Sequence, residues 1–169
     1  TVTPKYLKIN RLLVNANGDL FIAANIFVDV LEKIVGASTN TANNNVYGVW
    51  KYNTANNSWE QLVNFDNEVC AMEFGNAAQT AIVAASVHGQ VQRTTTLDNA
   101  PWTSVLPAGS SIIQGVSFSN VVQNGAENIM YVMTTSPFTL SKSTDGGATF
   151  TSTNLSISNF PFPPNNNDI

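Results

Sequence analysis

The sequence of 169 residues predicts an all-β fold built from repeated antiparallel sheets. Short apolar runs, rich in β-branched and aromatic residues, alternate with turns of Gly and Asn, as buried strands do. The same succession of runs occurs three times along the chain. Large aromatic residues close each copy at positions 59, 102 and 150, so the copies are spaced by 43 and 48 residues. A period of this length indicates a repeat architecture.

Each copy is expected to begin with an apolar strand, a short polar turn and a second strand. The first strands are expected at Ile9–Val14, Val69–Phe74 and Ile112–Phe118. The second strands are expected at Leu20–Ala24, Ala81–Ala85 and Ile129–Met133, after turns at 15–19, 75–79 and 120–128.

A hairpin that ends in an aromatic residue is expected to close each copy. Its first strands are predicted at 49–52, 91–93 and 139–142, and its closing residues are Trp59, Trp102 and Phe150. Four antiparallel strands per repeat are typical of the blades of a β-propeller. We therefore expect a partial β-propeller of about three blades, at roughly 9–64, 65–109 and 110–160 of a single domain. A two-sheet β-sandwich is the alternative, because 169 residues can complete one.

The turn of the third hairpin has the most constrained sequence, Ser143-Thr144-Asp145-Gly146-Gly147-Ala148-Thr149-Phe150. The carboxylate of Asp145 can fold back onto backbone N–H groups of the turn. Gly146 and Gly147 allow backbone angles that other residues resist. Phe150 can pack over the turn as the first large apolar residue of the next strand.

The spacing Ser-x-Asp-x-Gly-x-Thr-aromatic resembles the Asp-box, or bacterial neuraminidase repeat, of sialidase-like β-propellers. The second copy keeps only Thr96-x-Asp98 before Trp102, and the first copy lacks the Asp. The resemblance implies that the box joins the third and fourth strands of a blade, away from the central pocket. It therefore gives a structural role in the turn to Ser143, Asp145, Gly147, Thr149 and Phe150.

Catalysis is not favoured by the residues present. Sialidases of this fold use an arginine triad, which Arg11 and Arg93 alone cannot complete. The only histidine, His88, has no sequence signature of a nucleophile and an orienting acid. Glycoside hydrolysis needs two carboxylates across the scissile bond. The alternative function is a fragment of an Asp-box glycoside hydrolase. Its candidate catalytic acids are Asp66, Glu68, Glu73 and Glu127. The competing interpretation is that these acids are ordinary exposed surface charges.

Four aromatic residues surround the first hairpin and form a candidate ligand-binding group. Aromatic rings stack on the apolar faces of sugars, while amides bond their hydroxyls. Cross-strand packing within one sheet is the competing interpretation. The four residues are Tyr47, Trp50, Tyr52 and Trp59.

Composition indicates a weakly charged, polar surface. Charged residues make up 11% of the chain, against about 25% in an average domain. The chain instead has 23 Asn, 17 Thr and 14 Ser. A net charge of −4 gives no attraction to nucleic acid. The sequence contains no run of 18 apolar residues, so no membrane span is predicted. No metal cluster or cofactor motif is seen, so none is expected.

We therefore expect a non-catalytic recognition or structural module outside the cell or on a surface. Its expected partner is a glycan or a protein surface, and self-assembly into a surface lattice, virion or filament is the alternative. An insertion at 26–45 can form a short helix or an extended hairpin, followed by a polar loop. The proline-led segment 161–169 resembles an inter-blade connection, from which we expect a larger propeller to continue.

Overall fold

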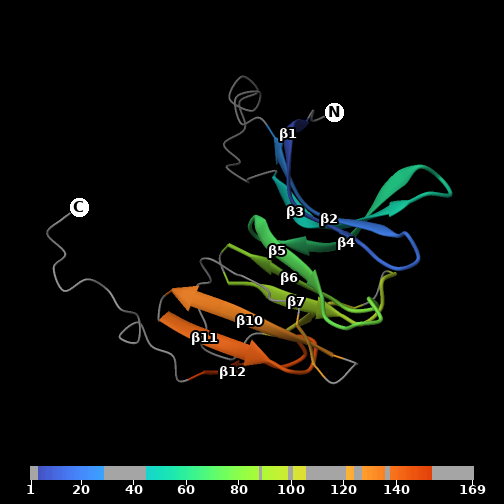
Figure 1. Cartoon of the computed structure of the whole chain (residues 1–169). Coiled ribbons are helices and arrows are strands. Elements are labelled where there is room, and N and C mark those ends of the chain that lie inside the picture. The colour runs from blue at the N-terminus through green and yellow to red at the C-terminus, as the bar shows by residue number, and fades with distance from the viewer. Residues whose placement is uncertain are drawn as a thin grey trace, which may run out of the picture.

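The computed structural model of the protein is made of β-strands (Figure 1). It describes residues 4–28, 45–87, 89–98, 101–105, 121–123, 127–135 and 138–153. These residues form twelve strands, which are arranged as three four-stranded antiparallel sheets with no helix in the described ranges. The expected all-β class is therefore confirmed. Within the same ranges, no helix is long and apolar enough to cross a membrane.

The first sheet has the strand order β1-β2-β3-β4. Its β1 starts five residues before the expected Ile9, because Tyr6 and Leu7 still pair with the end of β2. Residues 26–28 of the expected insertion belong to β2, and residues 29–44 lie outside the described part. The strands are β1 (Pro4–Val14), β2 (Leu20–Val28), β3 (Val46–Asn53) and β4 (Ser58–Phe65).

The second sheet has the order β5-β6-β7-β8 and follows the expected strands closely. Trp102 directly precedes the last strand, as expected for the residue that closes the hairpin. The strands are β5 (Val69–Phe74), β6 (Ile82–Ser86), β7 (Val91–Thr94) and β8 (Thr103–Ser104).

The third sheet has the order β12-β11-β10-β9, and here one expectation was wrong. Residues 120–128 were expected to form a turn, but they contain a strand at 121–123 that pairs with the start of β10. The pair Val121-Val122 explains this, because β-branched residues favour strands. The expected strand at 112–118 and the segment 161–169 lie outside the described residues. The strands are β9 (Val121–Gln123), β10 (Glu127–Thr135), β11 (Phe138–Ser143) and β12 (Thr151–Ser152).

The second sheet lies between the other two, and a hydrophobic core fills each of the two interfaces (Figure 1). Phe21 and Val49 of the first sheet pack with Met72 and Ile82 of the second. Residues on the other face of the second sheet, such as Val83, pack against the third sheet. This follows from the period of two in a strand, which sends neighbouring side chains to opposite faces.

Buried asparagines tie the neighbouring sheets together. Asn25 of β2 is fully buried, and its side-chain oxygen accepts a hydrogen bond of 2.8 Å from the Val69 N–H of β5. Asn128 of β10 is 4% exposed and donates from Nδ2 to the Phe74 carbonyl at the other end of β5, at 2.8 Å. Because a buried amide without partners is costly, each of these bonds favours one fixed alignment of the sheets.

Candidate functional site

The turn at 143–150 is closed by its own side chains. Asp145 Oδ1 accepts hydrogen bonds from Ser143 Oγ at 2.7 Å and from the Thr149 N–H at 2.9 Å. Thr149 Oγ1 donates to the other carboxylate oxygen at 2.6 Å, and Ser143 Oγ accepts from the Gly147 N–H at 2.8 Å. Although burial opposes ionisation, these donors to the carboxylate lower the pKa of Asp145 below its ordinary value. The carboxylate is thus engaged within the turn.

The same turn is packed against the second sheet. Gly147 has a φ of +79°, and a Cβ there would lie 2.5 Å from Val83 Cγ2. Phe150 is 7% exposed and belongs to the core between the second and third sheets. Arg93 of β7 donates from Nε to the Gly146 carbonyl at 2.9 Å. Every predicted residue of this turn therefore contacts the turn itself or the neighbouring sheet.

The four aromatic residues proposed for ligand binding do not form one surface. Tyr47 lies on the inward face of the first sheet, where its ring meets that of Phe27 edge-on at 5.9 Å. Tyr52 and Trp59 pair across β3 and β4 on the opposite face, with ring centroids 5.0 Å apart. Trp50 shares that face, and its indole N–H is buried without a hydrogen-bond partner. Alternation along β3 separates Tyr47 from the other three.

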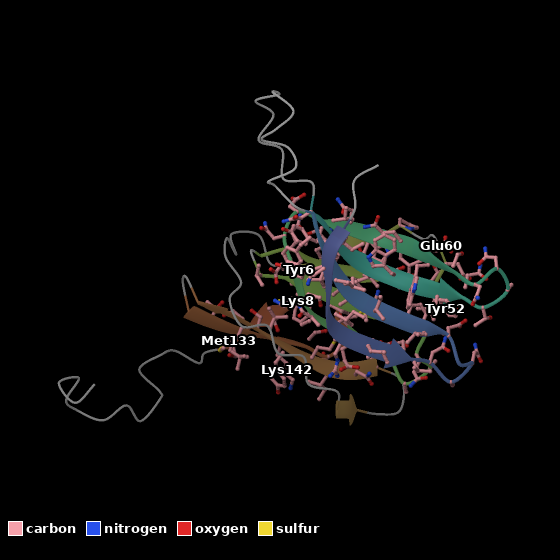
Figure 2. All side chains as sticks on the ribbon, turned by 90° about the horizontal axis from the view of Figure 1, so that it is seen from above. Tyr6, Lys8, Tyr52, Glu60, Met133 and Lys142 are labelled. Carbon is pink, nitrogen blue, oxygen red and sulfur yellow. The ribbon has the colours of Figure 1, made fainter. Side chains whose placement is uncertain are left out.

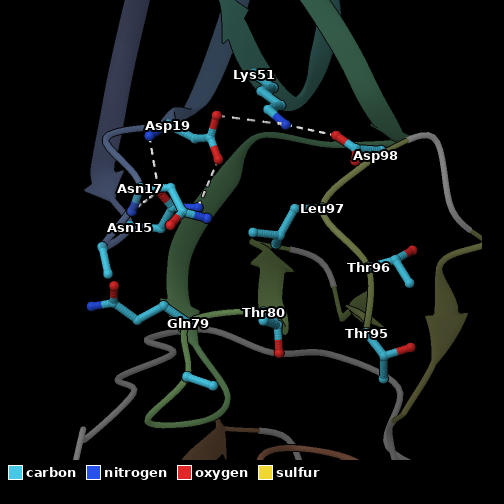
Figure 3. A pocket seen from close by; sticks show the side chains of 12 residues that line it. Asn15, Asn17, Asp19, Lys51, Gln79, Thr80, Thr95, Thr96, Leu97 and Asp98 are labelled. Atoms are coloured by element: carbon cyan, nitrogen blue, oxygen red, sulfur yellow. Dashed lines mark hydrogen bonds and ion pairs between the residues drawn. The ribbon is translucent and has the colours of Figure 1, made fainter.

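A polar pocket lies where turns of the first two sheets meet (Figure 3). Its volume is about 350 Å³. Three turns line it: the β1–β2 turn, the β5–β6 turn and the segment that follows β7. Its polar side chains come from Asn15, Asn17, Asp19, Lys51, Gln79, Thr80, Thr95, Thr96 and Asp98, and Leu97 adds an apolar surface.

Lys51 of β3 links the two carboxylates of the pocket. Its Nζ lies 2.6 Å from Asp98 Oδ1 and 3.8 Å from Asp19 Oδ1, and it sits 5.8 Å from the centre of the Phe21 ring. The Lys51 side chain is 17% exposed. Burial alone lowers the pKa of Lys51, but the hydrogen bond to Asp98 and the charges of both acids raise it above its ordinary value. One cation thus faces two acids, and the pocket keeps a net negative charge.

Some of the pocket's polar side chains support the turns, and others make no hydrogen bond within the part of the chain that the structure describes. Asn15 is 7% exposed; its Oδ1 accepts from the Asn17 and Asp19 N–H groups, which fixes the β1–β2 turn. In the β5–β6 turn Asn76 holds the backbone of Thr80 in the same way, at 2.9 Å. The side chains without a hydrogen bond to any described residue are Asn17, Gln79, Thr95 and Thr96. These amides and hydroxyls are available to a ligand.

The four candidate acids for hydrolysis lie at separate places, and three of them are engaged by a partner side chain. Glu68 pairs with Lys8 at 2.7 Å, and Glu73 with Arg11 at 2.5 Å, both between the first and second sheets. Asp66 accepts from Gln90 Nε2 at 2.7 Å. One oxygen of Glu127 is buried without a partner beside the 143–150 turn. His88 lies outside the described residues, and no three His, Cys, Asp or Glu side chains gather in the described part.

Sequence reasoning missed the pocket, although it located the turns that form it. The segments 15–19 and 75–79 were expected as turns, and the hairpin expected between 91–93 and Trp102 implies the third. The repeat itself could have predicted that these turns lie close together, because adjacent sheets of the same strand order bring their turns to the same end. Lys51 had no comparable signal, since its long side chain reaches the pocket from within β3.

Comparison with known proteins gives no relative for this chain. No family model matches it, and neither a curated protein nor a solved structure is significantly similar.

Proposed function

We propose that the protein is a non-catalytic recognition module that binds a polyhydroxylated ligand, such as a surface glycan, in the pocket between the three turns. The observation that carries this proposal is the set of unengaged amides and hydroxyls around a pocket of about 350 Å³. That volume falls within the range of roughly 300–1,000 Å³ typical of small-molecule sites.

The chemistry of the lining favours sugar hydroxyls over other ligands. Asn17 and Gln79 each supply a donor and an acceptor, and the threonines supply hydroxyls that can do either. Leu97 offers an apolar contact of the kind that suits a sugar ring. Asp19 and Asp98 outnumber Lys51, so an anionic ligand would be repelled and a neutral one tolerated.

We further propose a propeller-like architecture for the three sheets. Each sheet follows a simple up-and-down order, and consecutive sheets pack face to face. The 143–150 turn, which resembles an Asp-box in sequence, joins β11 and β12, the third and fourth strands of its sheet. An extracellular or surface location fits the low charge and the abundance of Asn, Thr and Ser.

The test is a glycan array, followed by calorimetric titration of any sugar that binds. Thr96→Val removes a pocket hydroxyl at nearly constant volume, and Gln79→Ala removes an amide. Each is expected to weaken binding by about tenfold, which corresponds to roughly 1.4 kcal/mol for one lost hydrogen bond. Thr54→Val, in the exposed β3–β4 turn, is the matched control and leaves affinity unchanged. The absence of any glycan ligand, or equal binding by the pocket variants, contradicts the proposal.

The tilted ring pair of Tyr52 and Trp59 supports a second candidate location for the same ligand class. Trp59 is 44% exposed and can offer a ring face to a sugar. Trp59→Ala separates the two locations, because it leaves the pocket intact. A loss of affinity in this variant alone places the ligand on the hairpin.

A further inference from the structure

The tip of the β3–β4 hairpin projects away from the second and third sheets (Figure 1). Every residue from 54 to 59 is exposed, and none of them lines the pocket or belongs to the two hydrophobic cores. Figure 2 shows Tyr52, which precedes this turn, at the opposite side of the molecule from Met133 of the third sheet. A bulky group attached to the tip would therefore disturb neither the pocket nor a sheet interface.

The exposed turn contains the sequence Asn56-Asn57-Ser58, which matches the acceptor motif of N-linked glycosylation, Asn-x-Ser with any x but Pro. The two side chains that the motif requires are in contact, because Ser58 Oγ donates a hydrogen bond to Asn56 Oδ1 at 2.6 Å. The sugar would be joined to Asn56 Nδ2, for which no described residue is a hydrogen-bond partner. The acceptor side chain is thus exposed, and its nitrogen is unengaged within the described part of the chain.

Other side chains hold the shape of the turn. Asn53 Oδ1 accepts a hydrogen bond from a backbone N–H of the turn at 3.0 Å, and the Tyr52 hydroxyl donates to Asn57 Oδ1. The rings of Tyr52 and Trp59 pair across the two strands beside the turn. None of these contacts involves the side-chain nitrogen of Asn56, so its modification leaves the hairpin intact.

The neighbouring asparagines lack the second half of the motif. Asn53 and Asn57 lie in the same hairpin, but the residues two positions after them are Ala55 and Trp59, which have no hydroxyl. A second complete match, at 154–156, lies outside the described residues and carries no structural argument. Among the described residues, Asn56 alone meets both the sequence requirement and the requirement for exposure.

We propose that Asn56 is an acceptor site for an N-linked glycan. The inference rests on the extracellular or surface location proposed above, because the enzymes of this modification act on chains that enter a secretory pathway. The co-reactant is an oligosaccharide carried on a lipid diphosphate. Asn56 Nδ2 attacks the anomeric carbon of the first sugar, a C–N bond forms, and the C–O bond to the diphosphate breaks. One proton leaves the nitrogen, and the lipid diphosphate is the leaving group.

Expression behind a cleavable secretory signal in insect cells, followed by mass spectrometry of the intact chain and of its peptides, tests the acceptor site directly. Because the signal is supplied, the outcome does not depend on the location proposed for the natural protein. The wild-type chain is expected to carry an oligosaccharide on Asn56. Peptide-N-glycosidase should remove it and convert that asparagine to aspartate, which separates this position from the motif at 154–156.

Three variants make the test specific. Ser58→Ala removes only the hydroxyl and is expected to abolish the glycan at Asn56, whereas Ser58→Thr keeps a hydroxyl and the glycan. Thr54→Val removes a neighbouring hydroxyl outside the motif and is the matched control, in which modification is unchanged. Circular dichroism checks that each variant is folded, and Asn56→Gln repeats the loss if Ser58→Ala is not.

The outcomes for the acceptor site and for the pocket are independent, because the glycan array uses protein produced in bacteria, without this modification. Loss of the glycan in Ser58→Ala, together with its retention in Ser58→Thr, supports the proposal. An unmodified Asn56 in the wild-type chain overturns it, and so does a glycan at this position that survives Ser58→Ala.

Discussion

The turns that precede β12 and β8 each carry an aspartate but use it differently. In the third sheet Asp145 bonds to Ser143 and Thr149 and so closes its own turn. In the second sheet Asp98 makes no such bond to any residue that the structure describes and reaches across to Lys51 of the first sheet, with its side chain 86% exposed. The same type of side chain thus stabilises one turn and forms part of a pocket wall in the other.

The neighbouring residues explain this difference. The 143–150 turn has two glycines with positive φ and a threonine that places its N–H and hydroxyl at the carboxylate. The second turn lacks the glycines, and Leu97 and Trp102 pack against the core of the first two sheets instead. No described residue of this turn donates to Asp98, which pairs with Lys51 instead. The aspartate of the second turn thus contributes a charged group to the candidate site.

The largest expected effect comes from Gly147→Ala. A Cβ there would lie 2.5 Å from Val83 Cγ2 and would also occupy a positive φ, so we expect a loss of about 2–4 kcal/mol of unfolding free energy. Gly18→Ala is the matched control: its φ is +85°, but nothing lies within 4 Å of the added carbon. It should cost only about 1 kcal/mol. Equal losses in denaturant melts would show that packing of the turn on the second sheet is unimportant.

The second largest effect is expected from Asp145→Ala. This variant should lose about 1–2 kcal/mol of unfolding free energy, because the turn loses its charged acceptor. Asp98→Ala should cost at most about 1 kcal/mol, as expected for an exposed ion pair. Thermal melts of both variants measure the difference between their losses of stability. An Asp98 variant as unstable as the Asp145 variant would contradict the division of roles.

A smaller effect is expected from acid. The folded-state pKa of Asp145 is lowered, so the unfolded chain binds more protons and stability rises with pH. This contribution is fully present above the unfolded value of about 3.9 and is lost as pH falls through the folded value. Asp145→Asn should therefore lose less stability than the wild type between pH 7 and pH 3 in urea titrations. Parallel pH curves would contradict this.

Strands were predicted well wherever local signals were strong. Val69–Phe74 was located residue for residue, because it is a continuous apolar run between polar turns. The turn expected at 120–128 was wrong, since its polar composition hid the strand-forming pair Val121-Val122. The split of the aromatic group was not foreseen either. It follows from the period of two along β3, which places Tyr47 and Trp50, three residues apart, on opposite faces. The strand was expected only over 49–52, so Tyr47 was not assigned to it.

The central claim is that the pocket between the three turns recognises a polyhydroxylated ligand. The most direct measurement is a two-dimensional ¹H–¹⁵N NMR titration of the wild-type protein with the glycan that binds best on an array. The predicted result is a cluster of amide shifts in residues 15–19, 76–80 and 95–98, with residues 143–150 unmoved. Shifts confined to the Trp59 indole and the β3–β4 turn, or no shifts at millimolar glycan, would contradict it.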